Sequence, residues 1–130
     1  ADVKMIATRE SYGNTLKALA AEGHDDLVVL DATSLPSKTG VFRKAHPDRH
    51  FDCGIAEANM MASPPACPPW AMFPLCPALQ LFAAGRAVSS KIRNSVAYPH
   101  LNREIGATHG GISVGEDGAS HQCCEDFALM

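Results

Sequence analysis

The chain has 130 residues, of which 46% are hydrophobic and 19% are charged, and its formal net charge is −3. This length suits one domain with a buried core, the charge argues against nucleic acid as the main partner, and no apolar run approaches the roughly 20 residues of a membrane span. The five cysteines, an odd number, favour reduced thiols in a cytoplasm over a disulfide scaffold.

The first part of the chain is predicted to form a helix, a strand and a loop. Apolar residues at helical spacing predict an amphipathic helix from Thr8 to Gly23, with the glycine as its C-terminal stop. The apolar run from Asp26 to Asp31 is typical of a parallel strand that is covered on both faces. Residues 32–40 predict a loop at the carboxyl end of that strand, where open α/β sheets bind ligands.

The rest of the chain continues this alternation of helices and short strands, which predicts an α/β fold with a parallel sheet. The expected elements are a strand at Arg49–Asp52, a helix at Ile55–Met61, a helix at Leu81–Tyr98, a strand at Glu104–Thr108, a glycine-rich loop at His109–Gly118 and a helix that begins at Gln122 and reaches Met130.

Residues 63–80 fit neither class. Six of the nine prolines lie within the fourteen residues from Pro64 to Pro77. Prolines at this density remove amide donors and exclude both a helix interior and a central strand. One interpretation is a polyproline-like surface loop or docking segment.

Ionisable side chains gather in the segment GEDGASHQ, residues 115–122. Its glycines allow tight turns, and Glu116, Asp117 and His121 lie close together in sequence, with His109 just upstream. Two imidazoles are therefore expected to face one pocket, although polar side chains on a solvated loop would give the same pattern. A zinc site that adds Cys123 and Cys124 is disfavoured because the chain has no CxxC pair.

Glu57 lies in the apolar stretch CGIAEANMM, near a predicted junction of strand and helix. Desolvation of its carboxyl there would favour proton exchange with a ligand, whereas spacing alone favours an exposed helix glutamate. No GxxxxGK[ST] sequence is present and no GxGxxG follows a strand, so an anion would have to meet residues such as Arg9, Ser37 and Lys38.

Taken together, these segments resemble the pyrimidine-binding domain of transketolase, a thiamine-diphosphate enzyme. The order and spacing of ATR, GIAE and H-x11-H with GEDG carry the resemblance, which is strongest to the short form in which this half is a separate subunit. It implies a three-layer α/β domain with a parallel sheet, incomplete at its C-terminus because the chain ends inside an expected helix. The matching stretches are ATRESYGN (7–14), VVLDA (28–32), PSKTGVF (36–42), FDCGIAEANMMA (51–62), LFAAGRA (81–87), IRNSVAYPHLN (92–102) and GATHGGISVGEDGASHQ (106–122).

The resemblance implies two residues that contact thiamine diphosphate. Glu57 looks like the family's catalytic glutamate, which contacts N1′ of the aminopyrimidine and favours its imino tautomer. Phe82 corresponds to the aromatic residue that stacks on the pyrimidine. In the family the diphosphate and its Mg²⁺ are held by another domain through a GDG motif, which this chain lacks. A diphosphate-binding domain or subunit is therefore expected as a partner, in a homo-oligomer or a heterotetramer, and this chain is expected to hold no metal and to be inactive alone.

The resemblance also implies five residues that bind a sugar phosphate. His109 and His121 match histidines that bind substrate hydroxyls and assist proton transfer. Asp117 matches an aspartate that binds a substrate hydroxyl, and Arg9 and Ser37 match groups that hold the phosphate. The implied activity is transfer of a two-carbon ketol unit from a ketose phosphate to an aldose phosphate.

Three alternatives stay open at this point. A deoxyxylulose-phosphate synthase or the beta subunit of a 2-oxo-acid dehydrogenase would use the same cofactor, although ATRES and the set His109, Asp117 and His121 favour transketolase. An inactive interaction module would bind a partner and catalyse nothing.

The anomalous segment 63–80 is also compatible with a compensated frameshift. With free choice among synonymous codons, reverse translation and a one-base shift turn it into IAAGLPAVGHVPFVSSFA, which joins LFAAGRA and looks like the family's usual sequence. Residues 33–36 and 88–91 allow similar restorations, to DLSP and to a string containing FEQ.

Overall fold

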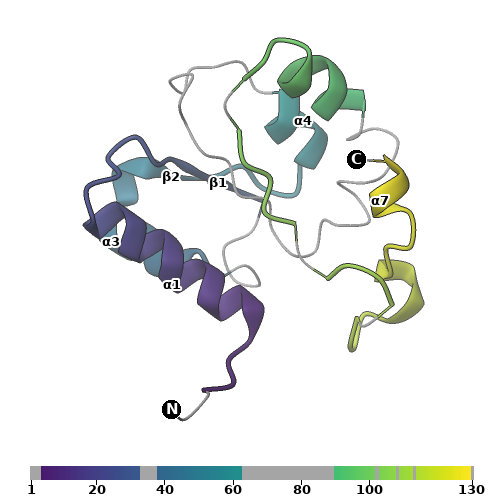
Figure 1. Cartoon of the computed structure of the whole chain (residues 1–130), viewed down its shortest axis with the longest axis horizontal. Helices are drawn as coiled ribbons and strands as arrows, with labels where there is room; N and C mark the ends of the chain where they lie inside the picture. Colours follow the sequence, from purple (N-terminus) through teal and green to yellow (C-terminus); the bar gives the residue numbers. More distant parts are fainter. Residues whose placement is uncertain are drawn as a thin grey trace.

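The computed structural model describes residues 4–32, 38–62, 90–101, 103–107, 109–112 and 114–129 (Figure 1). None of the helices in these ranges is long and apolar enough to cross a membrane. The elements are α1 (Thr8–Ala21), β1 (Val29–Asp31), α3 (Gly40–Ala45), the 3-10 turn η1 (Pro47–Arg49), β2 (His50–Asp52), α4 (Glu57–Ala62), the π-helical η3 (Ile92–Ala97), the 3-10 turn η4 (Gly118–His121) and α7 (Asp126–Leu129).

The two described strands, β1 and β2, pair in parallel, with Val29 opposite His50 and Asp31 opposite Asp52. The helices α1 and α3 lie on one side of this pair, and α4 and η3 lie on the other (Figure 1). Parallel strands of this kind need cover on both faces. The predicted parallel pairing is therefore confirmed.

Successive residues of β1 pack into different hydrophobic clusters because side chains alternate across a strand. Val29 belongs to a cluster with residues of α1 and α3, and Leu30 belongs to a second cluster with Met60 and Met61 of α4. All three residues of β1 are buried, as the apolar run predicts. The first cluster consists of Leu16, Ala20, Leu27, Val29 and Phe42, and the second of Leu30, Ala32, Met60 and Met61.

Two glycines determine where α1 ends and how closely the segment before α3 approaches it. Gly23 has a φ of 99° directly after the helix, so it ends α1 in the left-handed conformation that the prediction requires. Gly13 lies inside α1, where a Cβ atom would be 2.3 Å from the carbonyl oxygen of Lys38. The absence of a side chain at Gly13 therefore allows the backbone before α3 to press against α1.

Several predicted elements differ from the structure in extent. The strand expected at 26–31 is limited to Val29–Asp31, because Asp25 and Asp26 form a turn. The helix expected at 55–61 corresponds to α4, which begins at Glu57. The sequence patterns predict neither α3 nor η1, which both lie between the two strands.

Two predictions near the C-terminus differ from the structure. The strand expected at 104–108 is not found in residues 103–107, the part of this segment that the structure describes. This segment is held instead by Arg103, whose Nη1 donates to the carbonyl oxygen of Met61 at 3.1 Å. The helix expected from Gln122 begins only at Asp126, because Cys123 pairs with Gly111 in an isolated antiparallel bridge.

Two further expectations concern residues that the structure does not describe. The proline-rich segment 63–80 lies entirely outside the described residues. Of the helix expected at 81–98, the described part starts at Ser90 and continues into η3.

Candidate functional site

A cleft of about 730 Å³ lies where the first turn of α1 meets the loop before η4. A volume of this order suits a small organic ligand. The cleft brings together Arg9, from the start of the chain, and His109 and Asp117, from its last quarter. Its lining residues are Ala7, Thr8, Arg9, His109, Gly110, Val114, Gly115, Glu116 and Asp117.

The N-terminal end of α1 contributes positive charge to this cleft. Ala7, the N-cap residue, has extended backbone and makes no side-chain capping bond, and it lines the cleft together with Thr8 and Arg9. Because the first amides of a helix lack intrahelical acceptors, they favour an anion near this end. The Arg9 guanidinium adds a fork of donors at the same place.

The other wall of the cleft is a loop held by backbone bonds. The amide of Gly111 donates to the carbonyl of Cys123 at 2.9 Å, and the amide of Cys123 donates to the carbonyl of Gly111 at 3.1 Å. Cys123 is fully buried, so it anchors this loop to the protein. His109 has a φ of 62°, an unusual conformation for a residue with a side chain, which is sustained by this anchored backbone.

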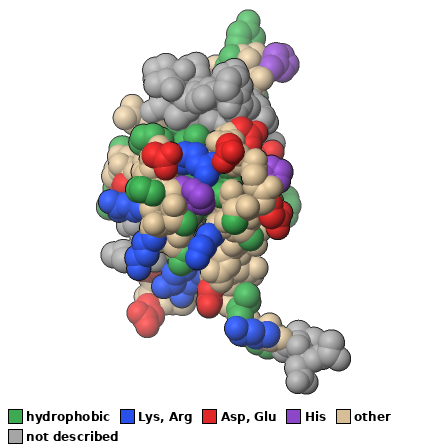
Figure 2. All heavy atoms as spheres, turned by 90° about the vertical axis from the view of Figure 1, so that its left-hand side faces the viewer, with side chains coloured by type: hydrophobic (Ala, Val, Ile, Leu, Met, Phe, Trp, Pro, Cys, Tyr) green, Lys and Arg blue, Asp and Glu red, His purple; other side chains and the backbone are tan. Residues whose placement is uncertain are grey.

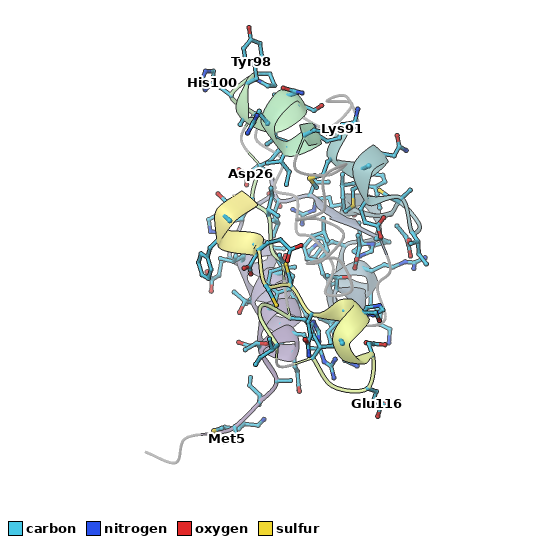
Figure 3. All side chains as sticks on the ribbon, turned by 90° about the vertical axis from the view of Figure 1, so that its right-hand side faces the viewer. Met5, Asp26, Lys91, Tyr98, His100 and Glu116 are labelled. Atoms are coloured by element: carbon cyan, nitrogen blue, oxygen red, sulfur yellow. The ribbon has the colours of Figure 1, made fainter. Side chains whose placement is uncertain are left out.

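The cleft is open and its charges are of both signs. Arg9, His109, Glu116 and Asp117 are all exposed. Glu116 points away from the body of the protein, at the end opposite to Tyr98 and His100 (Figure 3). Basic, acidic and histidine side chains are also intermingled on the face that α1 and α3 present (Figure 2). The described side chains of that face therefore form no broad patch of a single sign.

His121 lies next to the cleft but is not among its lining residues. Its Nδ1 is 3.0 Å from the Ser120 hydroxyl, which donates to the backbone carbonyl of Asp117 at 3.3 Å. The turn η4 therefore links His121 to Asp117. Of the five residues expected to bind substrate, the structure places Arg9, His109 and Asp117 on one cleft, and Ser37 lies outside the described residues.

Glu57 occupies a separate place, at the first residue of α4. The amide of Cys53 donates to the carbonyl of Asp31 at 2.7 Å, which continues the strand pairing up to the short connection before Glu57. The side chain of Glu57 is half-buried, and no described cation forms an ion pair with it. Phe82, the other residue expected to contact the cofactor, lies outside the described residues.

Two apolar side chains near Glu57 face solvent. Ile55 is 85% exposed and Phe51 is 48% exposed. Phe51 lies in β2, and Ile55 lies in the connection between β2 and α4, so both precede Glu57. Single exposed apolar side chains are common on protein surfaces, so these two residues do not define an interface by themselves.

A buried polar cluster, which the sequence patterns do not predict, lies between the strand pair and the start of α3. Asp31, Thr39 and His50 are 0%, 1% and 6% exposed. The Thr39 hydroxyl donates to Oδ2 of Asp31, and Thr39 Oγ1 is 3.1 Å from Nε2 of His50. Burial lowers the pKa of His50, with a further lowering contribution from Arg43 and opposing contributions from Asp31 and Asp52. The sequence signal covers two of the three residues, because Asp31 and His50 lie in the two predicted strands, whereas Thr39 lies in the predicted loop 32–40.

Within the ranges that the structure describes, no three or more His, Cys, Asp or Glu side chains are grouped so that they could hold a metal ion. His109, His121, Cys123 and Cys124 all lie in these ranges and are not grouped as ligands of one metal ion.

Comparison with known proteins identifies the family. Residues 4–130 match the family described as transketolase, pyrimidine binding domain. A putative transketolase C-terminal section from Methanocaldococcus jannaschii is 47% identical over 123 residues, which cover 94% of this chain and 38% of that protein. Human transketolase is 35% identical over 129 residues, which cover 96% of this chain and 20% of that protein.

A solved structure shows the same fold. The split gene transketolase described as an inactive beta4 tetramer superposes with a TM-score of 0.76 and 44% identity, over 98% of this chain and 40% of that chain. The chain thus spans two fifths or less of the length of these relatives. The family match covers residues 4–130, and the fold and the sequence are both similar to those of these relatives, so the chain belongs to the transketolase pyrimidine-binding domain family.

Proposed function

We propose that this chain supplies the pyrimidine-binding part of a thiamine-diphosphate-dependent transketolase, which transfers a two-carbon ketol unit from a ketose phosphate to an aldose phosphate. The observation that carries the proposal is the cleft in which Arg9, His109 and Asp117 meet. The strand pair with helices on both faces is then part of a three-layer domain.

The chemistry of the cleft suits a sugar phosphate. Arg9 and the first amides of α1 would hold the phosphate, because a guanidinium fork and a helix N-terminus both favour this anion. The Asp117 carboxylate would accept a hydrogen bond from a sugar hydroxyl. His109 would bind a second hydroxyl and move its proton, since a neutral imidazole has one donor and one acceptor nitrogen. His121, held beside Asp117, would assist from the same turn.

The position of Glu57 suits the pyrimidine ring of thiamine diphosphate. Its half-buried carboxyl follows Cys53, which packs against the second hydrophobic cluster, and it precedes Ala58, which packs there too. A carboxyl group in such surroundings can share a proton with a ring nitrogen. Phe82 would stack on the ring. When bound, the cofactor supplies the thiazolium carbon that carries the two-carbon unit, and a partner domain would supply the groups that bind the diphosphate and Mg²⁺.

The exposed apolar residues Ile55 and Phe51, which precede Glu57, are available for contact with a partner. We infer that a diphosphate-binding domain or subunit covers them, in a homo-oligomer or a heterotetramer. The similar split transketolase is described as an inactive tetramer of its beta chain, which agrees with a requirement for a second kind of subunit.

The experiment mixes this chain with a diphosphate-domain subunit of a split transketolase, thiamine diphosphate and Mg²⁺, and measures ketol transfer. Glu57→Gln is expected to lower kcat by at least about 100-fold, because general acid–base groups contribute about 10²- to 10⁴-fold. The matched control is Glu104→Gln, at an exposed glutamate outside the cleft, which should keep the wild-type rate. Full activity of Glu57→Gln would contradict the assigned proton role.

A second candidate function is an inactive interaction module, which the same exposed pair Ile55 and Phe51 also favours. A stable complex of wild-type chain and subunit without ketol transfer would support the module. Complex formation is measured separately by sedimentation, so a missing partner is not mistaken for missing catalysis.

We also propose that the sequence of residues 63–80 arose by a compensated frameshift, in the gene or in its sequencing. The proposal rests on the local crowding of prolines and on the restored string, which joins residues 81–87 without a gap. Resequencing the DNA tests it directly. Codons that cannot produce the restored string in the shifted frame would contradict it.

A further inference from the structure

The cluster of Asp31, Thr39 and His50 joins three elements that are separate in sequence. Asp31 is the last residue of β1, Thr39 is the N-cap residue of α3, and His50 is the first residue of β2. All three side chains are buried, and buried polar atoms of this kind are normally hydrogen-bonded. The contact between the start of α3 and the strand pair therefore includes a polar network.

The pattern of hydrogen bonds determines the protonation state of His50. The single hydroxyl proton of Thr39 is donated to Asp31, so Thr39 Oγ1 acts as the acceptor toward His50. Nε2 of His50 must then carry the proton that it donates at 3.1 Å. Nδ1 is left as the unprotonated nitrogen, and no atom of the described residues forms a hydrogen bond with it.

Adding a proton to Nδ1 would create a buried donor without an acceptor, on a ring that also becomes charged. The Phe42 ring lies 6.5 Å from the His50 ring, which makes these surroundings partly apolar. The charged groups that face His50 are Asp31 from β1, Arg43 from α3 and Asp52 from β2. Burial and Arg43 oppose the imidazolium, the two carboxylates favour it, and the net effect is that the pKa of His50 is lowered.

We propose that Asp31, Thr39 and His50 form an acid-sensitive latch, in which neutral His50 holds the start of α3 against the ends of β1 and β2, and protonation of His50 releases this contact. The proposal does not depend on the activity proposed above. Release would loosen the two segments that start at the latch. One is Lys38, which precedes Thr39 and touches α1 at Gly13, and the other is the connection from Cys53, whose amide is bonded to Asp31.

The direction of the pH effect follows from proton linkage. Because the folded chain binds the His50 proton more weakly than the unfolded chain, the unfolded chain carries more protons below the ordinary pKa of about 6.5. Stability is therefore fully present above this value and decreases as the pH falls through it. The unfolding equilibrium constant rises by up to about tenfold per pH unit for one proton, and this rise ends below the lowered pKa of the folded chain.

The test compares urea unfolding of the wild-type chain and His50→Phe at pH 7.5 and 5.5. Phenylalanine keeps a ring at this position but cannot be protonated. The increase in the unfolding constant on acidification is expected to be several-fold larger in wild type than in His50→Phe. The control His100→Asn removes an exposed histidine with a φ of 54°, which asparagine tolerates, and should behave like wild type. Equal pH dependence of wild type and His50→Phe would overturn the proposal.

Two measurements on the wild-type chain keep the proposal testable if His50→Phe does not fold. Nitrogen chemical shifts should show His50 protonated at Nε2 and titrating below the ordinary value, whereas titration at or above that value would overturn the latch. Hydrogen exchange should show local release. The amides of Phe42 and Arg43, which donate to Thr39, and of Cys53, which donates to Asp31, should lose more protection at pH 5.5 than those of α1. A uniform loss across the chain would contradict a local latch.

Discussion

The open cleft and the buried cluster are built from similar side chains, with opposite consequences. The cleft contains Arg9, His109 and Asp117, all exposed, and their donors and acceptors can reach a ligand. The cluster contains Asp31 and His50, both buried, and each is within hydrogen-bond distance of the Thr39 hydroxyl. A carboxylate and an imidazole therefore do not define a site by themselves. Burial decides whether they stabilise the fold or are available for chemistry.

The largest effect is expected from Phe42→Ala, which removes the fully buried ring next to His50. Truncation of a buried phenylalanine costs about 3–5 kcal/mol of unfolding free energy, because apolar contacts are lost and a cavity remains. Urea denaturation measures this loss. The matched change Phe51→Ala removes a half-exposed ring and should cost less than half as much. Similar losses for the two variants would show that burial does not separate the two regions.

Arg9→Ala is expected to affect binding and to leave stability unchanged. Loss of a charge-assisted hydrogen bond to phosphate costs about 1.5–3 kcal/mol, which corresponds to an increase of roughly 10- to 150-fold in KM for a sugar phosphate. The assembled enzyme is used for this measurement, and the isolated chain is used for denaturation.

The control for Arg9→Ala is Arg93→Ala, at an exposed arginine of η3 that does not line the cleft. Arg93→Ala should change neither the KM for the sugar phosphate nor the free energy of unfolding. An unchanged KM for Arg9→Ala, or a clear loss of stability, would remove Arg9 from the proposed site.

Thr39→Val tests how much the buried cluster of Asp31, Thr39 and His50 contributes to stability. It removes the hydroxyl that bonds both Asp31 and His50 and leaves their buried polar atoms without this partner. The expected loss is about 1–3 kcal/mol of unfolding free energy, without a change in phosphate binding. Thr15→Val is the control, since its hydroxyl bonds Ser11 at an exposed position of α1 and should contribute far less. Equal losses of unfolding free energy for Thr39→Val and Thr15→Val would contradict a stabilising role of the cluster.

The smallest effect is expected from Asp25→Asn. Asp25 lies 3.6 Å from Arg49, and its side chain is 89% exposed. Solvent screens such pairs, so removal of this charge should cost no more than about 0.5 kcal/mol in urea denaturation. Arg49 keeps its bonds to the His24 carbonyl and to Nδ1 of His46. A cost above about 1 kcal/mol would mean that exposed charges contribute to stability as buried ones do.

Local patterns were sufficient where a segment carries its own signal. The apolar spacing in residues 8–23 predicted α1, and Gly23 ended it through the positive φ that glycine allows. The apolar run before Asp31 predicted a strand buried on both faces, although the structure shortens it to three residues. Order and spacing of short motifs were sufficient to recognise the family, which the match over residues 4–130 confirms.

Local sequence patterns predicted the wrong secondary structure where contacts between distant segments determine the backbone conformation. Residues 104–107 have the composition of a strand, but the contact from Arg103 to Met61 holds this segment without a ladder. Cys123 was expected at the start of a helix, and its bridge to Gly111 delays that helix to Asp126. Hydrogen bonds of this kind join residues far apart in the chain, so a window of neighbouring residues contains no sign of them.

The sequence by itself determined the family, the alternation of helices and parallel strands, and the set of side chains from which a sugar-phosphate site was predicted. Only the tertiary structure decided that Arg9, His109 and Asp117 share a cleft while His121 lies beside it. Only the tertiary structure placed Asp31, Thr39 and His50 together out of contact with water. The physical reason is that periodicity reports which face of an element is apolar, whereas solvent exposure and partnership of a polar group depend on every element packed around it.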